Sequence, residues 1–275
     1  MLTSSLALAN VSCGVGVRSP ASDTVVHQTP ITLSGYSLVF VSAHIDGQEV
    51  QALVDTGSAS AVRLSARLAH RLQLALTTVS AATMRGLDGQ AYAIQRGRVG
   101  SLQIAGIQDK DVVIEVTGER IEAISSQVGT PFDVVLGWGF LARDDFLLDY
   151  QRRVLQLGPP IHPVPPRTDA LNAIPYLATH RLPIIAARIG ERDVRLLVDT
   201  GAPMCNLDAA FTGLPAGQSV NRVLHLGAQP LQVQWRVKDL TVTQRALGTI
   251  GTLGNNLLSR YSVGFRVREQ TMILG

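Results

Sequence analysis

Short apolar runs rich in Val, Ile, Leu and Ala alternate along this chain with turns of Gly, Pro, Asp and Asn. Such runs are typical of β-strands, because each is short and is bounded by residues that favour turns. Helical spacing of apolar residues is confined to Leu64–Leu72 and to a turn or two after Gly137 and after Gly254. The pattern predicts an all-β fold with short helices. The predicted strands cover 37–45, 48–54, 99–104, 111–116, 146–150, 154–157, 184–189, 192–198, 231–237 and 271–274.

The second half of the chain repeats the first half. Ile45–Gly57 matches Ile189–Gly201 without a gap, and Val135–Arg143 matches Thr252–Arg260 further on. A Pro-rich stretch separates the copies, and proline removes backbone donors and interrupts regular structure. The repeat therefore predicts an N-terminal tail or partial export signal over 1–34, a first lobe over 35–158, a linker over 159–176 and a shorter second lobe over 177–275.

Each copy contains Asp-Thr-Gly at the end of an apolar strand, at Asp55–Gly57 and at Asp199–Gly201. One such motif alone is more often an ordinary turn that ends a strand. Two motifs at matching positions of a duplicated unit change this judgement, because a pseudo-twofold axis can bring both turns together. The repeat therefore predicts two facing carboxylates, those of Asp55 and Asp199.

These motifs resemble those of the retropepsin-like aspartic proteases, whose clan includes pepsin and the retroviral proteases. Leu53–Ser58 and Leu197–Ala202 carry the motif, and each is followed by a Leu-Gly signal, at Leu136-Gly137 and at Leu253-Gly254. The resemblance covers 35–158 and 177–275. It implies two β-barrel lobes related by a pseudo-twofold axis, each with a short helix, and an active site between them. It also implies a single-chain aspartic endopeptidase of bacterial type with Asp55 and Asp199 as catalytic residues.

The chemistry of such a dyad follows from two carboxylates about 3 Å apart, which cannot both ionise cheaply and therefore share one proton. The ionised aspartate takes a proton from a water that attacks the scissile carbonyl, and the protonated aspartate donates to the carbonyl oxygen. The sequence leaves open which aspartate begins as the base. Ser58 could donate to Asp55, whereas Ala202 has no hydroxyl for Asp199, so the two carboxylates should be unequal. The residues expected to support the dyad are Thr56, Gly57, Ser58, Thr200, Gly201 and Ala202.

The resemblance also implies a flap, a hairpin that closes over the bound peptide and excludes water. Asp88-Gly89 is a hairpin-turn signal downstream of the first motif, and Gly227 follows the second motif at a similar spacing. An ordinary surface hairpin is the alternative for both. The predicted flap and substrate-binding residues are Arg85, Gly86, Leu87, Asp88 and Gly89 in the first lobe and Leu226, Gly227 and Ala228 in the second.

The second motif departs from the first, because Pro203 follows it and lacks an N–H group. A catalytically inactive peptide-binding or scaffolding protein of the same fold is therefore a second hypothesis. A dimer of chains that pairs like motifs is a third and less economical one. The leading hypothesis is a monomeric endopeptidase that acts on a peptide or protein substrate, since one chain holds both halves of the dyad.

Composition and charge restrict the other classes of function. The formal net charge is +3 and basic residues are scattered among acidic ones, so no nucleic-acid partner is expected. Cys13, Cys205 and the dispersed histidines form no metal-ligand pattern, so we expect neither a metal nor another cofactor. No apolar stretch reaches the ~20 residues of an integral membrane span. Ala7-Leu8-Ala9 has the form of a signal-peptidase site, which favours a periplasmic or secreted protein over the cytoplasmic alternative.

Overall fold

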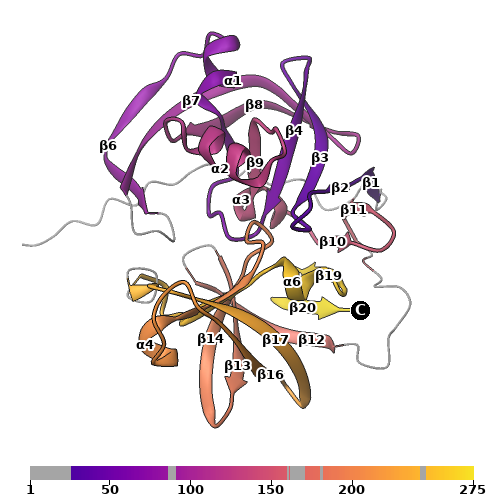
Figure 1. Cartoon of the computed structure of the whole chain (residues 1–275). Helices are drawn as coiled ribbons and strands as arrows, with labels where there is room; N and C mark the ends of the chain where they lie inside the picture. The colour runs from indigo at the N-terminus through magenta and orange to yellow at the C-terminus, as the bar shows by residue number, and fades with distance from the viewer. Residues whose placement is uncertain (1–25, 86–90, 160, 162–170, 180–181, 242–245) are drawn as a thin grey trace, which may run out of the picture.

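The computed structural model describes residues 26–85, 91–159, 161, 171–179, 182–241 and 246–275 of this chain. They form mainly β-strands, arranged as two lobes that Figure 1 shows one above the other. Each lobe contains a closed barrel, and a further sheet joins the two. The all-β, two-lobe fold predicted from the repeat is thus confirmed.

Six strands close the barrel of the first lobe. Their order is β3 (Val39–Ile45), β4 (Gln48–Asp55), β9 (Val134–Gly137), β5 (Val62–Leu64), β8 (Ile107–Val116) and β7 (Ala91–Ile104). Pairing of β7 with β3 completes the ring, which leaves no open edge within it. Outside the ring, β6 (Thr77–Arg85) pairs with β7, and β2 (Thr32–Leu33) pairs with β3.

The barrel of the second lobe repeats this arrangement. Its strands are β13 (Leu182–Ile189), β14 (Arg192–Val198), β18 (Gly251–Leu253), β15 (Cys205–Asp208), β17 (Gln229–Lys238) and β16 (Ser219–Leu226). β13 closes on β16 as β3 closes on β7. In each lobe a parallel pair, β4 with β9 or β14 with β18, brings the Asp-Thr-Gly motif beside the Leu-Gly segment. The two glycine signals are therefore neighbours of the motifs in space.

One strand of the first lobe has no counterpart in the second. In the first lobe β6 lies between α1 (Ala66–Arg71) and β7. In the second lobe α4 (Ala209–Thr212) leads to β16 through residues 213–218, all of which are described and none of which is in a strand. The second lobe is shorter because it omits this hairpin strand.

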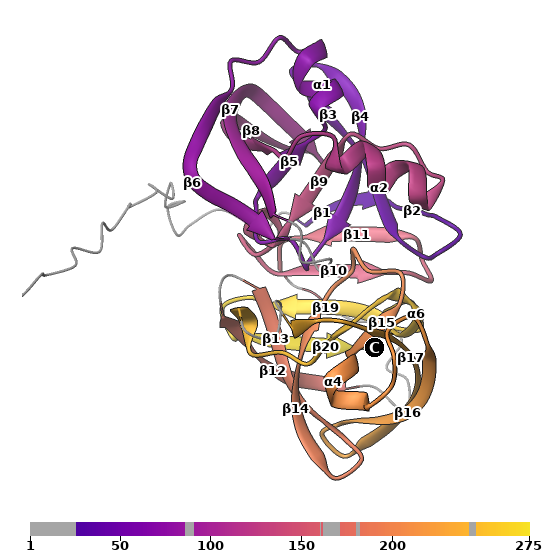
Figure 2. The same cartoon turned by 60° about the vertical axis from the view of Figure 1, so that its left-hand side comes forward.

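A six-stranded antiparallel sheet joins the lobes (Figure 2). Its order is β1 (His27–Pro30), β11 (Val154–Leu157), β10 (Phe146–Asp149), β19 (Ser262–Arg266), β20 (Thr271–Leu274) and β12 (Leu171–Thr179). β10 from the first lobe pairs directly with β19 from the second. The rings of Trp138, Phe146, Tyr176 and Phe265 pack together here with centroids 4.9 to 5.9 Å apart. Aromatic packing of this kind stabilises the relative position of the lobes.

This sheet corrects two boundaries expected from the sequence. Residues 27–33, assigned to the N-terminal tail, form β1 and β2, and residues 171–176, assigned to the linker, belong to β12. Proline occurs in both β1 and β12, at Pro30 and Pro175, and it weakens the local strand signal. Pairing with β11 stabilises β1, pairing with β3 stabilises β2, and pairing with β20 stabilises β12, so only the tertiary structure reveals them.

The helices are short and follow strand ends. α1, α3 (Trp138–Leu141) and α6 (Asn255–Leu258) lie where helical spacing predicts them. α2 (Arg120–Val128) and α4 are additional, although Ile121, Ile124 and Val128 show the helical spacing that could have identified α2. Among the described residues, no helix has the length and apolar character that a bilayer span requires.

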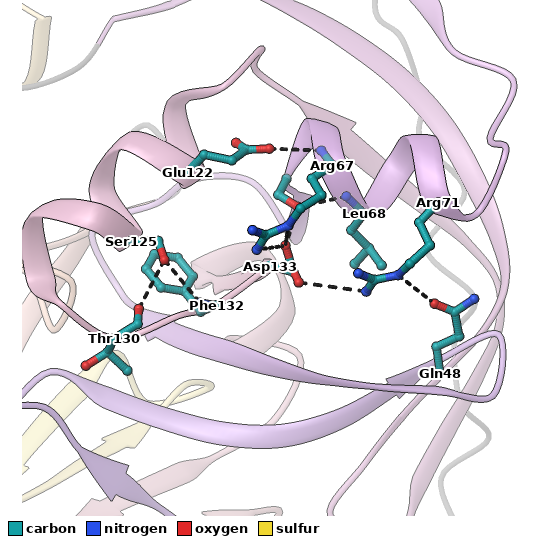
Figure 3. Close-up of polar contacts among 10 residues, drawn as sticks. Gln48, Arg67, Leu68, Arg71, Glu122, Ser125, Thr130, Phe132 and Asp133 are labelled. Carbon is teal, nitrogen blue, oxygen red and sulfur yellow. Dashed lines mark hydrogen bonds and ion pairs between the residues drawn. The ribbon is translucent and has the colours of Figure 1, made fainter.

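Polar contacts attach α1 to its surroundings on the first lobe (Figure 3). Ser65 caps the helix by accepting from the N–H of Leu68 at 2.9 Å, and its hydroxyl donates to Asp133 at 2.6 Å. Asp133 also pairs with Arg67 at 2.7 Å and with Arg71 at 3.8 Å. Glu122 of α2 accepts from the backbone N–H of Arg67 at 2.9 Å. Glu122 and the Ser65 hydroxyl thus satisfy two orphan N–H groups of the first helical turn, and Asp133 holds the capping serine and the two arginines.

Candidate active site

Asp55 and Asp199 lie together where the two lobes meet. Asp55 is the last residue of β4, and Asp199 directly follows β14. A Cβ atom placed on Gly57 would come closer than 3.0 Å to the carboxyl atoms of Asp199, and one on Gly201 would come equally close to those of Asp55. Each carboxyl therefore packs on the backbone of the opposite motif. Only glycine leaves room for this reciprocal contact.

The two threonines of the motifs cross-link the lobes. Thr56 Oγ1 donates to the carbonyl oxygen of Val198 at 2.8 Å and accepts from the N–H of Thr200 at 3.0 Å. Thr200 Oγ1 likewise donates to the carbonyl of Val54 at 2.8 Å and accepts from the N–H of Thr56 at 3.0 Å. Both threonines are fully buried, so the four bonds form a closed network shielded from water. The network stiffens the floor beneath the dyad.

Each carboxyl is also held within its own turn. The N–H of Gly57 donates to Asp55 Oδ1 at 2.9 Å, and that of Gly201 donates to Asp199 Oδ1 at 3.0 Å. The turns close by matching 3.2 Å bonds, from Ser58 N–H to the Asp55 carbonyl and from Ala202 N–H to the Asp199 carbonyl. The second turn thus keeps the geometry of the first although Pro203 follows it.

Gly137 and Gly254, the glycines of the two Leu-Gly segments, pack against the loops that follow the Asp-Thr-Gly motifs. A Cβ atom on Gly137 would meet the carbonyl oxygens of Ser58 and Ser60, and one on Gly254 would meet those of Met204 and Ala202. The next residue in each case donates its N–H to the turn, from Trp138 to the Ser58 carbonyl at 2.7 Å and from Asn255 to the Ala202 carbonyl at 2.9 Å. The Leu-Gly signals therefore serve close packing beneath the dyad.

Burial raises the pKa of both Asp55 and Asp199 above the ordinary range of an aspartate, and the pKa of Asp199 rises further. For Asp55, the charge of Arg63 and the N–H groups of Gly57 and Ser58 oppose this rise. For Asp199, the neighbouring charge of Asp55 adds to it. A hydrogen bond between the two side chains lowers the pKa of Asp55 and raises that of Asp199. At intermediate pH the pair therefore holds one proton and one negative charge.

The surroundings of the two carboxyls differ beyond Ser58 and Ala202. The hydroxyl of Ser58 accepts a hydrogen bond from Arg63 Nη2 at 3.2 Å. The second lobe has Ala202 and Asn206 at the matching positions, since Arg63 pairs with Val135 as Asn206 pairs with Thr252. The first half of the dyad thus has a buried cation near it, whereas the matching strand position of the second lobe holds a neutral amide.

Three residues of this site were not predicted from the sequence: Arg63, Asn255 and Tyr150. Asn255 is fully buried, and its amide donates to the carbonyls of Thr200 at 2.6 Å and Ala202 at 3.1 Å. The hydroxyl of Tyr150 donates to Asn255 Oδ1 at 2.6 Å. A charge inside the apolar run Val62-Arg63-Leu64 was the one local signal, because a strand buried on both faces seldom contains arginine.

The hairpin of β6 and β7 contains the predicted flap of the first lobe. Arg85 ends β6 and pairs with Ala91, whereas Gly86, Leu87, Asp88 and Gly89 lie outside the described residues. The ends of β6 and β7 nearest this turn lie on the side of the lobe that faces the second lobe (Figures 1 and 2). This arrangement places a hairpin stem beside the junction that contains the dyad.

The turn of Leu226, Gly227 and Ala228 lies elsewhere, which corrects the expected second flap. It joins β16 to β17, and Leu224 of β16 pairs with Ile189 at the start of the β13–β14 turn. β14 runs from that turn to Asp199, a path of roughly 20 Å at the rise of an extended strand. The turn therefore corresponds to the β7–β8 turn of the first lobe and lies at the end of the barrel away from the dyad.

Within the described ranges, no group of three or more His, Cys, Asp or Glu side chains is arranged to bind a metal ion. Cys205 is buried and unpaired with another cysteine, and burial raises the pKa of its thiol to about 12. This thiol is therefore a small buried side chain and not a reactive group at ordinary pH.

Residues 41–143 match the model of one protein family, described as gag-polyprotein putative aspartyl protease. No curated protein matches the chain. The matched segment contains Asp55, the β6–β7 hairpin and the Leu-Gly segment that supports the first turn. The second barrel repeats the strand order of the first and returns its own Asp-Thr-Gly turn to the same junction. Residues 41–143 of the first lobe are therefore similar to the aspartyl protease family, and the chain as a whole has the two barrel lobes of the retropepsin-like fold.

Proposed function

We propose that the protein is an aspartic endopeptidase whose dyad is formed by Asp55 and Asp199 within one chain. The observation that carries this proposal is the reciprocal packing of each carboxyl on the glycine of the opposite motif. A pair of structural turns would not require such an approach, because either carboxyl could face solvent instead. The shared hydrogen bond and the raised pKa of both groups supply the one-proton state that acid and base catalysis needs.

In this mechanism the dyad binds a water molecule between the two carboxyls. The ionised carboxyl accepts a proton as the water oxygen attacks the carbonyl carbon of the peptide bond. The protonated carboxyl donates to the carbonyl oxygen, which gives a tetrahedral diol. The carboxyl that took a proton from the water then gives it to the amide nitrogen, and the other carboxyl takes one from the diol as the C–N bond breaks. The dyad therefore again holds a single proton.

Replacement of either aspartate tests the proposal directly. Asp55→Asn and Asp199→Asn each remove one titrating group while keeping the shape of the side chain. We expect either change to lower kcat/KM for peptide cleavage by at least about 10³-fold, since both proton-transfer roles are needed in one turnover. Cleavage of a peptide library, followed by mass spectrometry over acidic to neutral pH, measures the effect.

A matched control is Asp109→Asn, which changes an aspartate of β8 outside the dyad. Its activity should stay near that of the unaltered protein, and circular dichroism should show that all three variants remain folded. Full cleavage by either dyad variant would refute the proposal. Peptide binding without cleavage by the unaltered protein would also refute it.

A further inference from the structure

We propose that Arg63 is a positioning residue that keeps the negative charge of the dyad on Asp55, so that Asp55 begins the reaction as the base and Asp199 as the acid. The roles of base and acid rest on the proposed function. The location of the charge itself depends only on the structure around the two carboxyls.

Arg63 is a cation enclosed beside the first motif. It lies in the middle of β5, and only 8% of its surface is exposed. Its Nη2 atom donates to the hydroxyls of Ser58 at 3.2 Å and Ser60 at 2.9 Å. Both serines belong to the segment that follows Asp55. The arginine is therefore fixed within the loop that presents this carboxyl, and it cannot turn away into solvent.

Charged groups on neighbouring elements define the field at Asp55. Arg63 of β5 acts on it through its charge, and Asp199 of the second lobe acts on it through a hydrogen bond. Behind Arg63, Glu115 of β8 accepts from the Ser60 hydroxyl at 2.6 Å and pairs with Arg96 of β7 at 3.1 Å. The remaining charges are more distant from Asp55: Arg120 of α2 acts on Arg63, and Lys238 of β17 acts on Asp199.

The charges around Arg63 favour the ionised form of Asp55. The charges of two carboxylates, those of Asp55 and Glu115, both stabilise the charged form of Arg63, and the Ser60 hydroxyl bonds to both Arg63 and Glu115. Glu115 also forms an ion pair with Arg96, so Arg63 is not its only cationic neighbour. A buried cation stabilises the ionised form of the carboxylates near it.

The second lobe lacks this arrangement. Asn206, at the position of Arg63, donates to the carbonyl of Met204 and to the hydroxyl of Thr252, both at 2.9 Å. Ala202 stands where the first lobe has Ser58, and it has no hydroxyl that could accept a hydrogen bond from a cation. Lys238 is the least of the influences on Asp199, after burial and the charge of Asp55. The difference in pKa between the two carboxyls follows the same direction as this geometry.

The assignment fixes the path of each proton. Asp55 accepts a proton from the water as the oxygen–carbon bond forms, and Asp199 gives its proton to the carbonyl oxygen. After the C–N bond breaks, the proton taken by Asp55 has passed to the departing nitrogen, and Asp199 has recovered one from the diol. The net change is the addition of one water across the peptide bond, and Arg63 neither gains nor loses a proton.

The position of the negative charge within the dyad can be found without an activity assay, by titrating one carboxyl at a time. Asp199→Asn leaves only Asp55 of the dyad to titrate, and Asp55→Asn leaves only Asp199. NMR of protein labelled at the aspartate carboxyl carbons follows each titration. Adding Arg63→Met should move the midpoint of Asp55 to higher pH and should move that of Asp199 much less. Equal movement of both midpoints, or an unmoved Asp55, would overturn the proposal.

Two further variants guard against a simple folding defect. Glu115→Gln removes the anion on the far side of Arg63, so it should shift the Asp55 midpoint to lower pH, opposite in sign to Arg63→Met. A rise or no change would contradict the role of Arg63. Arg67→Met makes the same substitution at an exposed arginine of α1 and should leave both midpoints in place.

The pH profile of the enzyme with an intact dyad gives the catalytic readout. Arg63→Met should lower kcat/KM about tenfold on the acidic limb, where Asp55 becomes protonated, with a smaller change at the optimum. Arg63→Lys should recover much of this loss because it retains the cation. An equal loss at every pH would show a structural role alone. If the unaltered protein cleaves no peptide, the proposed function fails, while the NMR titration still decides the role of Arg63.

Discussion

At the scale of single residues, the dyad can form because Gly57 and Gly201 have no Cβ atom. Gly57 and Gly201 allow each backbone turn to touch the carboxyl of the other lobe. The sequence motif identifies these positions, but it does not say which atoms press against them. The close approach explains why a minimal side chain at either position would separate the carboxyls and disturb both lobes.

Gly57→Ala tests this contact. The added methyl group would overlap the Asp199 carboxyl, so we expect a loss of about 1–3 kcal/mol in the free energy of unfolding. Peptide cleavage should fall at least tenfold, because small misplacements of reacting groups are costly. Thermal unfolding and kcat/KM measure the two effects. Gly35→Ala is the control, since no atom lies within 4 Å of its added Cβ; equal behaviour of the two variants would contradict the packing argument.

Other residues of the site gave weak or no signals in the sequence. Arg63 lies in a short strand whose three residues are all buried, and the sequence did not predict this strand. Asn255 belongs to a segment identified only for its glycine signal. The roles of both residues depend on partners distant in the chain, so no local pattern contains them.

At the scale of elements, the regular strands follow from local alternation of side chains. β17 alternates buried and exposed residues along most of its length, as a strand with one face in the core must. Of the β6–β7 hairpin, the sequence predicts the turn and residues 99–104 of β7 but not β6, because the polar and small residues of 77–85 give no clear alternation. Pairing with the long strand β7 determines this hairpin instead.

The attachment of α1 predicts a pH-dependent contribution to stability. Hydrogen bonds from Ser65 and Arg67 and the charges of Arg67 and Arg71 outweigh the effect of burial and hold the pKa of Asp133 below its ordinary range. A lowered pKa stabilises the folded state above the unfolded-state pKa, and this stabilisation is lost as the pH falls through the folded-state pKa.

Asp133→Asn should therefore lower the free energy of unfolding by about 1 kcal/mol at neutral pH, a modest value because both arginines are exposed. The difference between the variant and the unaltered protein should shrink in acid, where Asp133 is protonated. Urea unfolding at several pH values checks this trend. A difference that stays constant with pH would show that packing, and not ionisation, is responsible.

At the scale of the whole molecule, the position of one lobe on the other decides whether a dyad exists. The six-stranded sheet, the aromatic rings at its centre and the threonine network all connect the lobes. Tyr150 extends this connection, since it follows β10 and binds Asn255 beneath the second motif. The geometry of the second turn is thus coupled to the sheet that joins the lobes.

Tyr150→Phe should weaken this coupling. The change leaves the buried Oδ1 of Asn255 without its donor, which should cost about 1–3 kcal/mol of stability. Cleavage activity should also decrease, because the Asn255 amide holds the carbonyls of Thr200 and Ala202. Thermal unfolding and peptide cleavage provide the measurements. Tyr36→Phe is the matched control at a tyrosine that is 56% exposed and should be nearly neutral; a loss of equal size there would argue against the coupling.

The sequence alone determined the β class, the two lobes and the two candidate carboxyls, because these follow from local alternation and from a repeat that any reader of the chain can align. Only the tertiary structure decided which residues surround the carboxyls. The pairing of β5 with β9 places Arg63 near the first motif, and the antiparallel sheet makes strands of residues 27–30 and 171–176. The register of β16 with β13 places the turn at Gly227 far from the site. Each of these outcomes depends on pairing between distant segments, whose free energy is not encoded in any one of them.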